Sequence, residues 1–110
     1  HLRRRYFEIW IARCQMLSEC GKSDQALLDI SKMILAIPEN PGARQARIEI
    51  LEKMQKYEQA LKDIDFLIVK YPDIAEWYKM KAKFQRKLNK PKDAAATEKR
   101  MKDVIEFGSK

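Results

Sequence analysis

The residues able to do catalytic or metal chemistry are few in this chain and lie far apart. Its 110 residues include two cysteines, Cys14 and Cys20, and one histidine, His1. A structural zinc site takes four Cys or His ligands, so no metal site is predicted. The three glycines are isolated and form no phosphate-binding loop. Asp63 and Asp65 stand two positions apart on an expected helix, where they would diverge on a solvated face. The sequence therefore predicts neither catalysis nor a cofactor.

A different chemistry is offered by a basic stretch in the last third of the chain. Seven Lys and Arg residues fall between positions 79 and 92, and no acidic residue follows until Asp93. Residues 75–110 carry eleven basic against five acidic residues, a net charge of +6 out of +7 for the whole chain. Such a stretch is typical of a surface that binds an acidic partner, either a protein segment or a nucleic acid. The competing interpretation is a solvated helix face without a partner.

A spacing of 34 residues organises the whole chain. Ala26, Ala60 and Ala94 are separated by this interval, and so are Pro38 and Pro72. The apolar residues that follow the first two alanines lie at i, i+1, i+4, i+7, i+8 and i+11, which is one wide face of a helix. A second apolar helical stripe precedes each alanine. The sequence therefore predicts repeated pairs of helices.

The boundaries between these helices are marked by turn and capping residues. Gly21 provides a turn, and Ser23 is expected to cap the helix that follows it. Asn40 is an expected N-cap, because proline stands at the next position, where a helix tolerates it best. Asn89 is expected to start the last helix in the same way. Six helices in three pairs, joined by short turns, are predicted.

These features resemble the tetratricopeptide repeat family, whose 34-residue unit follows the pattern W-x2-L-G-x2-Y, A-x3-F, P. In the first unit, about residues 7–40, the matching positions hold Trp10, Arg13, Cys14, Leu17, Ala26, Ile30 and Pro38. The other units cover about 41–74 and 75–108. The resemblance implies an all-α fold, a right-handed superhelical stack of three antiparallel helix pairs, in a single domain over residues 1–110. Because the chain begins with His1 rather than Met, we expect it to belong to a longer protein.

The third unit departs most from the pattern of the other two. Glu98 and Lys102 stand where the earlier units have isoleucines, at Ile30 and Ile34 and again at Ile64 and Ile68. In a stack of repeats this stripe would be covered by the next unit, and terminal units need a polar outer face. We therefore expect no fourth repeat to follow.

The resemblance also implies a function, namely non-catalytic protein–protein interaction of the adaptor, co-chaperone or scaffold type. The first helix of each pair would line a concave groove that holds a segment of a partner protein. The expected groove positions are Glu8, Ile11, Ala12, Gln15, Gln45, Ala46, Glu49, Glu76, Lys79, Met80 and Lys83, with Arg86 and Lys87 at the edge. The residues predicted to bind the partner are Gln15, Gln45, Glu49, Lys79, Lys83, Arg86 and Lys87. Acidic segments are favoured because the third unit makes one end of the groove basic.

Other partners are open or disfavoured. RNA binding through the basic third unit is the main alternative, and a structural spacer or self-association module within a larger enzyme is another. The acidic C-terminal tail of heat-shock chaperones is disfavoured, because the family's clamp for that tail uses asparagines. Here the only asparagines, Asn40 and Asn89, stand at helix boundaries. No apolar run is long enough for a membrane span, no signal peptide is visible, and the thiols suggest a reducing, cytoplasmic or nuclear location.

Overall fold

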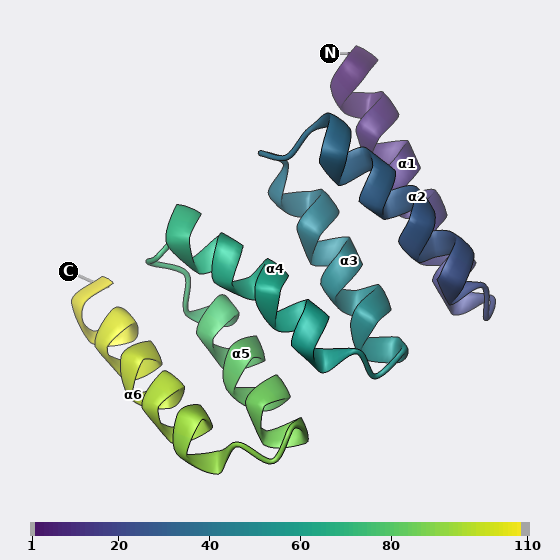
Figure 1. Cartoon of the computed structure of the whole chain (residues 1–110). Coiled ribbons are helices and arrows are strands. Elements are labelled where there is room, and N and C mark those ends of the chain that lie inside the picture. Colours follow the sequence, from purple (N-terminus) through teal and green to yellow (C-terminus); the bar gives the residue numbers. More distant parts are fainter. Residues whose placement is uncertain (1, 109–110) are drawn as a thin grey trace. The chain divides into compact units, whose positions relative to one another are not determined.

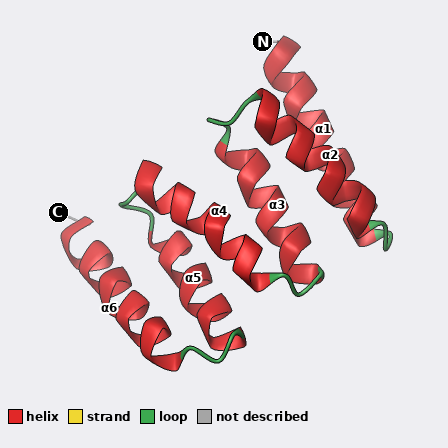
Figure 2. Cartoon of the chain, viewed as in Figure 1, coloured by secondary structure: helices red, strands yellow, loops and turns green. Residues whose placement is uncertain are grey.

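The structure, a computed structural model, describes the backbone of residues 2–108, and every element in this range is a helix (Figures 1 and 2). The helices are α1 (Leu2–Glu19), α2 (Ser23–Ala36), α3 (Pro41–Lys53), α4 (Tyr57–Lys70), α5 (Ala75–Lys87) and α6 (Pro91–Gly108). The predicted all-α fold is confirmed. His1, considered above as a chemical group, lies outside the described residues. The chain divides into two compact bodies between Lys56 and Tyr57. These bodies are not the 34-residue repeats of the sequence, and from here on "first unit" and "second unit" refer to the two bodies.

The first unit consists of α1, α2 and α3, each packed against the other two. Its core contains Ala26 and Ile30 from α2, Cys14 from α1, and Ala43 and Ile50 from α3, all at most 1% exposed. An alanine at position 26 leaves room for the neighbouring helices to approach closely, since its side chain ends at Cβ. The amphipathic pattern of the sequence thus becomes a buried three-helix core.

The second unit consists of α4, α5 and α6, with α5 packed against both of the others. Trp77 and Phe84 of α5 are 4% and 1% exposed, and the Phe84 ring lies 5.5 Å from the Tyr57 ring of α4. Between α5 and α6, the buried hydroxyl of Thr97 of α6 donates a hydrogen bond of 2.7 Å to the side chain of Gln85 of α5. These contacts fix which face of α5 remains in solvent.

The 34-residue spacing reappears in the backbone conformation. Gly21, Gln55 and Asn89 have positive φ angles of 82°, 59° and 62°. Each follows a helix, and the next amide donates a hydrogen bond back to the carbonyl five residues earlier. These bonds are Lys22 N to Leu17 O (2.8 Å), Lys56 N to Leu51 O (2.9 Å) and Lys90 N to Gln85 O (2.9 Å). This is the Schellman motif, which satisfies the last carbonyls of a helix. Ala26, Ala60 and Ala94, five residues further on, are all fully buried.

The predicted helix caps are right in one case and wrong in two. The Asn40 side chain accepts hydrogen bonds from the amides of Gly42 (2.8 Å) and Ala43 (3.3 Å), so it caps α3 as expected. Ser23 is instead the first residue of α2, and no side chain caps that helix. Asn89 ends α5 in the left-handed conformation and does not start α6. Asparagine is one of the few residues that tolerates this conformation, so its position at a boundary was ambiguous in the sequence.

Candidate functional site

The solvent face of α5 carries a row of lysines. Lys79, Lys83 and Lys87 are exposed and follow each other at intervals of four residues, which places them on one side of the helix. The ammonium of Lys83 lies 5.9 Å from the centroid of the Phe84 ring. We call these three residues the α5 row. Trp77, Ala82 and Phe84 are buried, and this leaves the side of α5 with Lys79, Lys83 and Lys87 in solvent.

Two other cations of the basic stretch are engaged within the second unit. Arg86 forms a two-pronged ion pair with Glu98 of α6, in which its Nη1 donates to Oε2 at 3.0 Å and its Nη2 to Oε1. The hydrogen bond from Arg86 lowers the pKa of Glu98, against partial desolvation, and the same bond raises the pKa of Arg86. Lys81 pairs with Asp65 of α4 at 2.8 Å. A partner that binds Arg86 would have to compete with Glu98.

The first unit holds the predicted groove residues Gln15, Gln45 and Glu49. Gln45 and Glu49 are exposed on α3, and Gln15 of α1 donates a hydrogen bond of 3.4 Å to Glu49. Gln15 and Glu49 thus come together across two helices, at the rim of a small hollow of about 50 Å³. Ala46, which was expected at the groove surface, is fully buried. That expectation is wrong, because Ala46 lies in the core that α3 forms with α1 and α2.

A larger hollow of about 640 Å³ lies at the start of α1 and α3. Two expected groove residues, Glu8 and Ile11, line it together with Arg4, Phe7, Asn40, Pro41 and Gly42. A Cβ at Gly42 would lie 3.1 Å from Asn40 Oδ1, the atom that caps α3, and 3.4 Å from the Ile11 side chain. Glycine therefore leaves room for the cap. The hollow combines an apolar floor with one acid and one cation.

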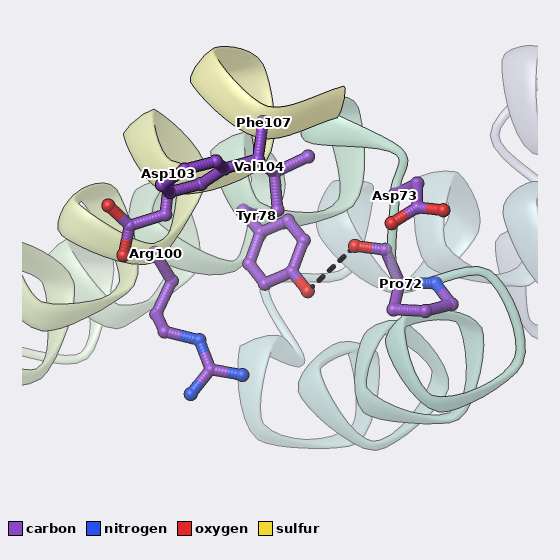
Figure 3. Close-up of a pocket in the computed structure, with 7 residues that line it drawn as sticks. All are labelled: Pro72, Asp73, Tyr78, Arg100, Asp103, Val104 and Phe107. Atoms are coloured by element: carbon purple, nitrogen blue, oxygen red, sulfur yellow. Dashed lines mark hydrogen bonds between the residues drawn. The ribbon is translucent and has the colours of Figure 1, made fainter. Parts of the chain in front are cut away.

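The second unit contains a pocket that the sequence did not indicate. It has a volume of about 510 Å³ and is lined by Pro72, Asp73, Tyr78, Arg100, Asp103, Val104 and Phe107 (Figure 3). The buried Tyr78 donates a hydrogen bond of 3.0 Å to the carbonyl of Pro72, which ties α5 to the loop before it. In Figure 3 the carboxylate of Asp73 lies on the opposite side of Tyr78 from that of Asp103. In the sequence, Pro72 was notable only for its spacing of 34 residues from Pro38.

Two groups that could do chemistry, Cys14 and Asp63, are buried in the structure. Burial raises the pKa of Cys14, which opposes formation of a reactive thiolate. Asp63 is only 2% exposed and takes part in a polar interaction, so its predicted place on a solvated face is wrong. Across residues 2–108 no cluster of three metal-binding side chains occurs, and no helix is long and apolar enough to cross a membrane.

Comparison with known proteins gives the fold and no closer relationship. No family model matches the sequence, and no curated protein does. Among solved structures, "MamA MSR-1 C2" matches with a TM-score of 0.79 and 15% identity over 92% of this chain. "MamA AMB-1 P212121" matches with a TM-score of 0.78 and 15% identity over 91% of this chain. The chain spans 58% and 59% of the lengths of these two structures. The likeness shows that the chain has a tetratricopeptide-like helical fold.

Proposed function

We propose that this chain is a non-catalytic protein-interaction module that binds an acidic segment of a partner protein along the α5 row. The tetratricopeptide-like fold supports an interaction role. The observation that carries the proposal is that Lys79, Lys83 and Lys87 are all exposed on one side of α5. Lys81 and Arg86 of the same basic stretch form ion pairs with Asp65 and Glu98.

The spacing of the α5 row fits an extended segment with acids at alternate positions. Residues four apart on a helix are separated by about 6 Å along its axis. Alternate residues of an extended chain are separated by about 6.6 Å and point to the same side. Three glutamates or aspartates at i, i+2 and i+4 of a partner segment would therefore meet Lys79, Lys83 and Lys87 in turn. Arg86 belongs to the proposed site only as an edge residue that Glu98 holds in place.

The groove residues of the first unit are proposed as a second, less charged contact. Gln15, Gln45 and Glu49 offer amide donors and acceptors and one carboxylate, a set suited to the backbone of an extended segment. The hydrogen bond between Gln15 and Glu49 holds two of these side chains in a defined geometry. Their contribution is directional and does not depend on net charge.

The test uses a fluorescein-labelled decapeptide with glutamates at three alternate positions and the double variant Lys79→Glu/Lys83→Glu. Each exposed ion pair contributes up to about 1 kcal/mol, so the double reversal is expected to weaken binding by about tenfold or more. The matched control is Lys92→Glu/Lys99→Glu, which changes the net charge equally through two exposed residues of α6. Equal losses in both variants would refute the α5 row as the site. Circular dichroism checks that helicity is unchanged.

RNA binding is the second candidate, favoured by the net charge of +7. Single-strand binding uses aromatic side chains on which bases stack. The aromatic residues of α5 are unsuited to this, because Trp77, Tyr78 and Phe84 are 4%, 5% and 1% exposed. A labelled single-stranded RNA at low salt tests the candidate. Binding tighter than that of the acidic decapeptide, and falling steeply with added salt, would favour RNA over protein.

A further inference from the structure

One face of α1 is exposed although the matching faces of α3 and α5 are buried. Ile9 and Met16 of α1 are 67% and 64% exposed, and Arg13 between them is exposed as well. The residues 34 and 68 positions later are at most 4% exposed; they are Ala43 and Trp77 for Ile9, and Ile50 and Phe84 for Met16. Ala12 and Cys20 extend the face, and each is exposed where its counterparts are buried or half-buried. We call Ile9, Ala12, Arg13, Met16 and Cys20 the α1 face.

The matching faces of α3 and α5 are covered by equivalent helices, α2 in the first unit and α4 in the second. In the first unit α2 packs against α3, and Arg47 donates a hydrogen bond of 3.4 Å to Ser31 of α2. In the second unit α4 packs against α5, and Lys81 pairs with Asp65 of α4 at 2.8 Å. The two cations are 34 residues apart, and so are their two acceptors. An apolar face with a central cation therefore receives, in both cases, a helix that offers a hydroxyl or a carboxylate to that cation.

We propose that the α1 face binds an amphipathic helix that places a carboxylate or hydroxyl against Arg13 and apolar residues over Ile9 and Met16. Arg13 stands 34 residues before Arg47 and so occupies the position of the paired cation. Apolar residues at four of the five positions supply surface for burial. The proposal concerns a different helix and a different partner chemistry from the α5 row and does not depend on it.

A second copy of this chain is a poor occupant, because the corresponding helix has the wrong charge. In α6 the position that matches Ser31 and Asp65 is held by Lys99, which is exposed. A copy docked in the register of the repeats would set Lys99 against Arg13, and like charges in contact are unfavourable. Lys102 likewise replaces the isoleucines at positions 34 and 68. The charges thus favour a helix from a partner with an acid or hydroxyl at this register.

The test uses a labelled peptide with the sequence of α4, Tyr57–Lys70, held helical by a staple on its exposed side. This helix covers the matching face of α5 and carries Asp65 at the required position. We expect saturable binding to the full chain that weakens about fivefold or more in Arg13→Glu. A peptide with Asp65→Lys should recover that loss in Arg13→Glu while binding the unchanged chain less well. Ile9→Ser should also weaken binding.

The controls separate this surface from unspecific binding and from self-association. Leu35→Ser removes an apolar side chain that is 84% exposed on α2 and should leave peptide binding unchanged. Binding that persists in Ile9→Ser, or a loss in Arg13→Glu that the Asp65→Lys peptide does not recover, would overturn the proposal. Reversible self-association in sedimentation velocity, abolished by Ile9→Ser, would show that a second copy covers the face instead. Lys79→Glu/Lys83→Glu should not affect this peptide, which keeps the test independent of the proposed α5 site.

Discussion

Replacing Gly21 by alanine tests whether the left-handed turns that recur every 34 residues are required for stability. Gly21 has a φ of 82°, and a Cβ added there would meet no atom within 4 Å. The effect of the substitution therefore arises from the backbone alone and not from a steric clash. L-residues in the left-handed region are disfavoured by about 1–2 kcal/mol. Alanine also restricts the unfolded chain, which offsets about 0.4–1 kcal/mol.

The expected net loss for Gly21→Ala is about 1 kcal/mol, measured as the free energy of unfolding in urea by circular dichroism. In a chain of this size such a loss lowers the midpoint of thermal unfolding by about 4 °C. The reciprocal substitution is Gln55→Gly, at a φ of 59°. It relieves the same strain and should stabilise the chain, by less than about 1 kcal/mol because glycine gains freedom in the unfolded state.

Opposite signs at the two positions are the critical result. A neutral Gly21→Ala would refute the left-handed turn at the end of α1. A destabilising Gln55→Gly would show that the glutamine side chain contributes more than its backbone strain. Asn89→Gly, at a φ of 62°, should be close to neutral, since asparagine already tolerates this conformation.

Three further predictions follow from named contacts. Asn40→Ala removes the acceptor of two amide hydrogen bonds and should lower the free energy of unfolding by about 1 kcal/mol, whereas Asn40→Asp should retain most of it. Glu98 has a lowered pKa in the folded chain, so its contribution with Arg86 is present above the ordinary carboxyl pKa and is lost as pH falls through the folded value. Urea titrations of the unchanged chain and Glu98→Gln should therefore differ at neutral pH and converge in acid. Cys20 is exposed and Cys14 buried with a raised pKa, so Ellman's reagent should react with one thiol rapidly and with the other slowly; equal rates would contradict the burial of Cys14.

The sequence predicted those features that depend on spacing along one helix. The burial of Ala26, Ala60 and Ala94 follows from their spacing of 34 residues, which is visible in the sequence alone. The cap at Asn40 also follows from local residues, because the proline beside it leaves few alternatives. Asn89 stands in a similar context with a proline two positions later, yet it ends a helix, since asparagine serves both roles.

Features that depend on packing between helices were beyond sequence reasoning. The pairing of Arg86 with Glu98 joins residues 12 positions apart, and that of Lys81 with Asp65 joins residues 16 apart. Neither spacing has a meaning on a single helix, so the basic stretch looked uniform until its neighbours were known. Asp63 is buried for the same reason: its surroundings are set by other helices.

The faces of α1 and α6 differ in a way that decides which of them can accept a further helix. Covering Ile9 and Met16 would remove two largely exposed apolar side chains from water, and complete burial of such a side chain is worth about 1.5–3 kcal/mol. On α6, Glu98 and Lys102 stand at the positions where α2 and α4 carry isoleucines, and Glu98 is already paired with Arg86. Covering that ion pair would desolvate two charges without forming a new bond, which is unfavourable. A polymer of this chain needs both faces to bind each other, whereas a partner helix needs only the α1 face. We therefore expect binding of a partner helix without polymerisation.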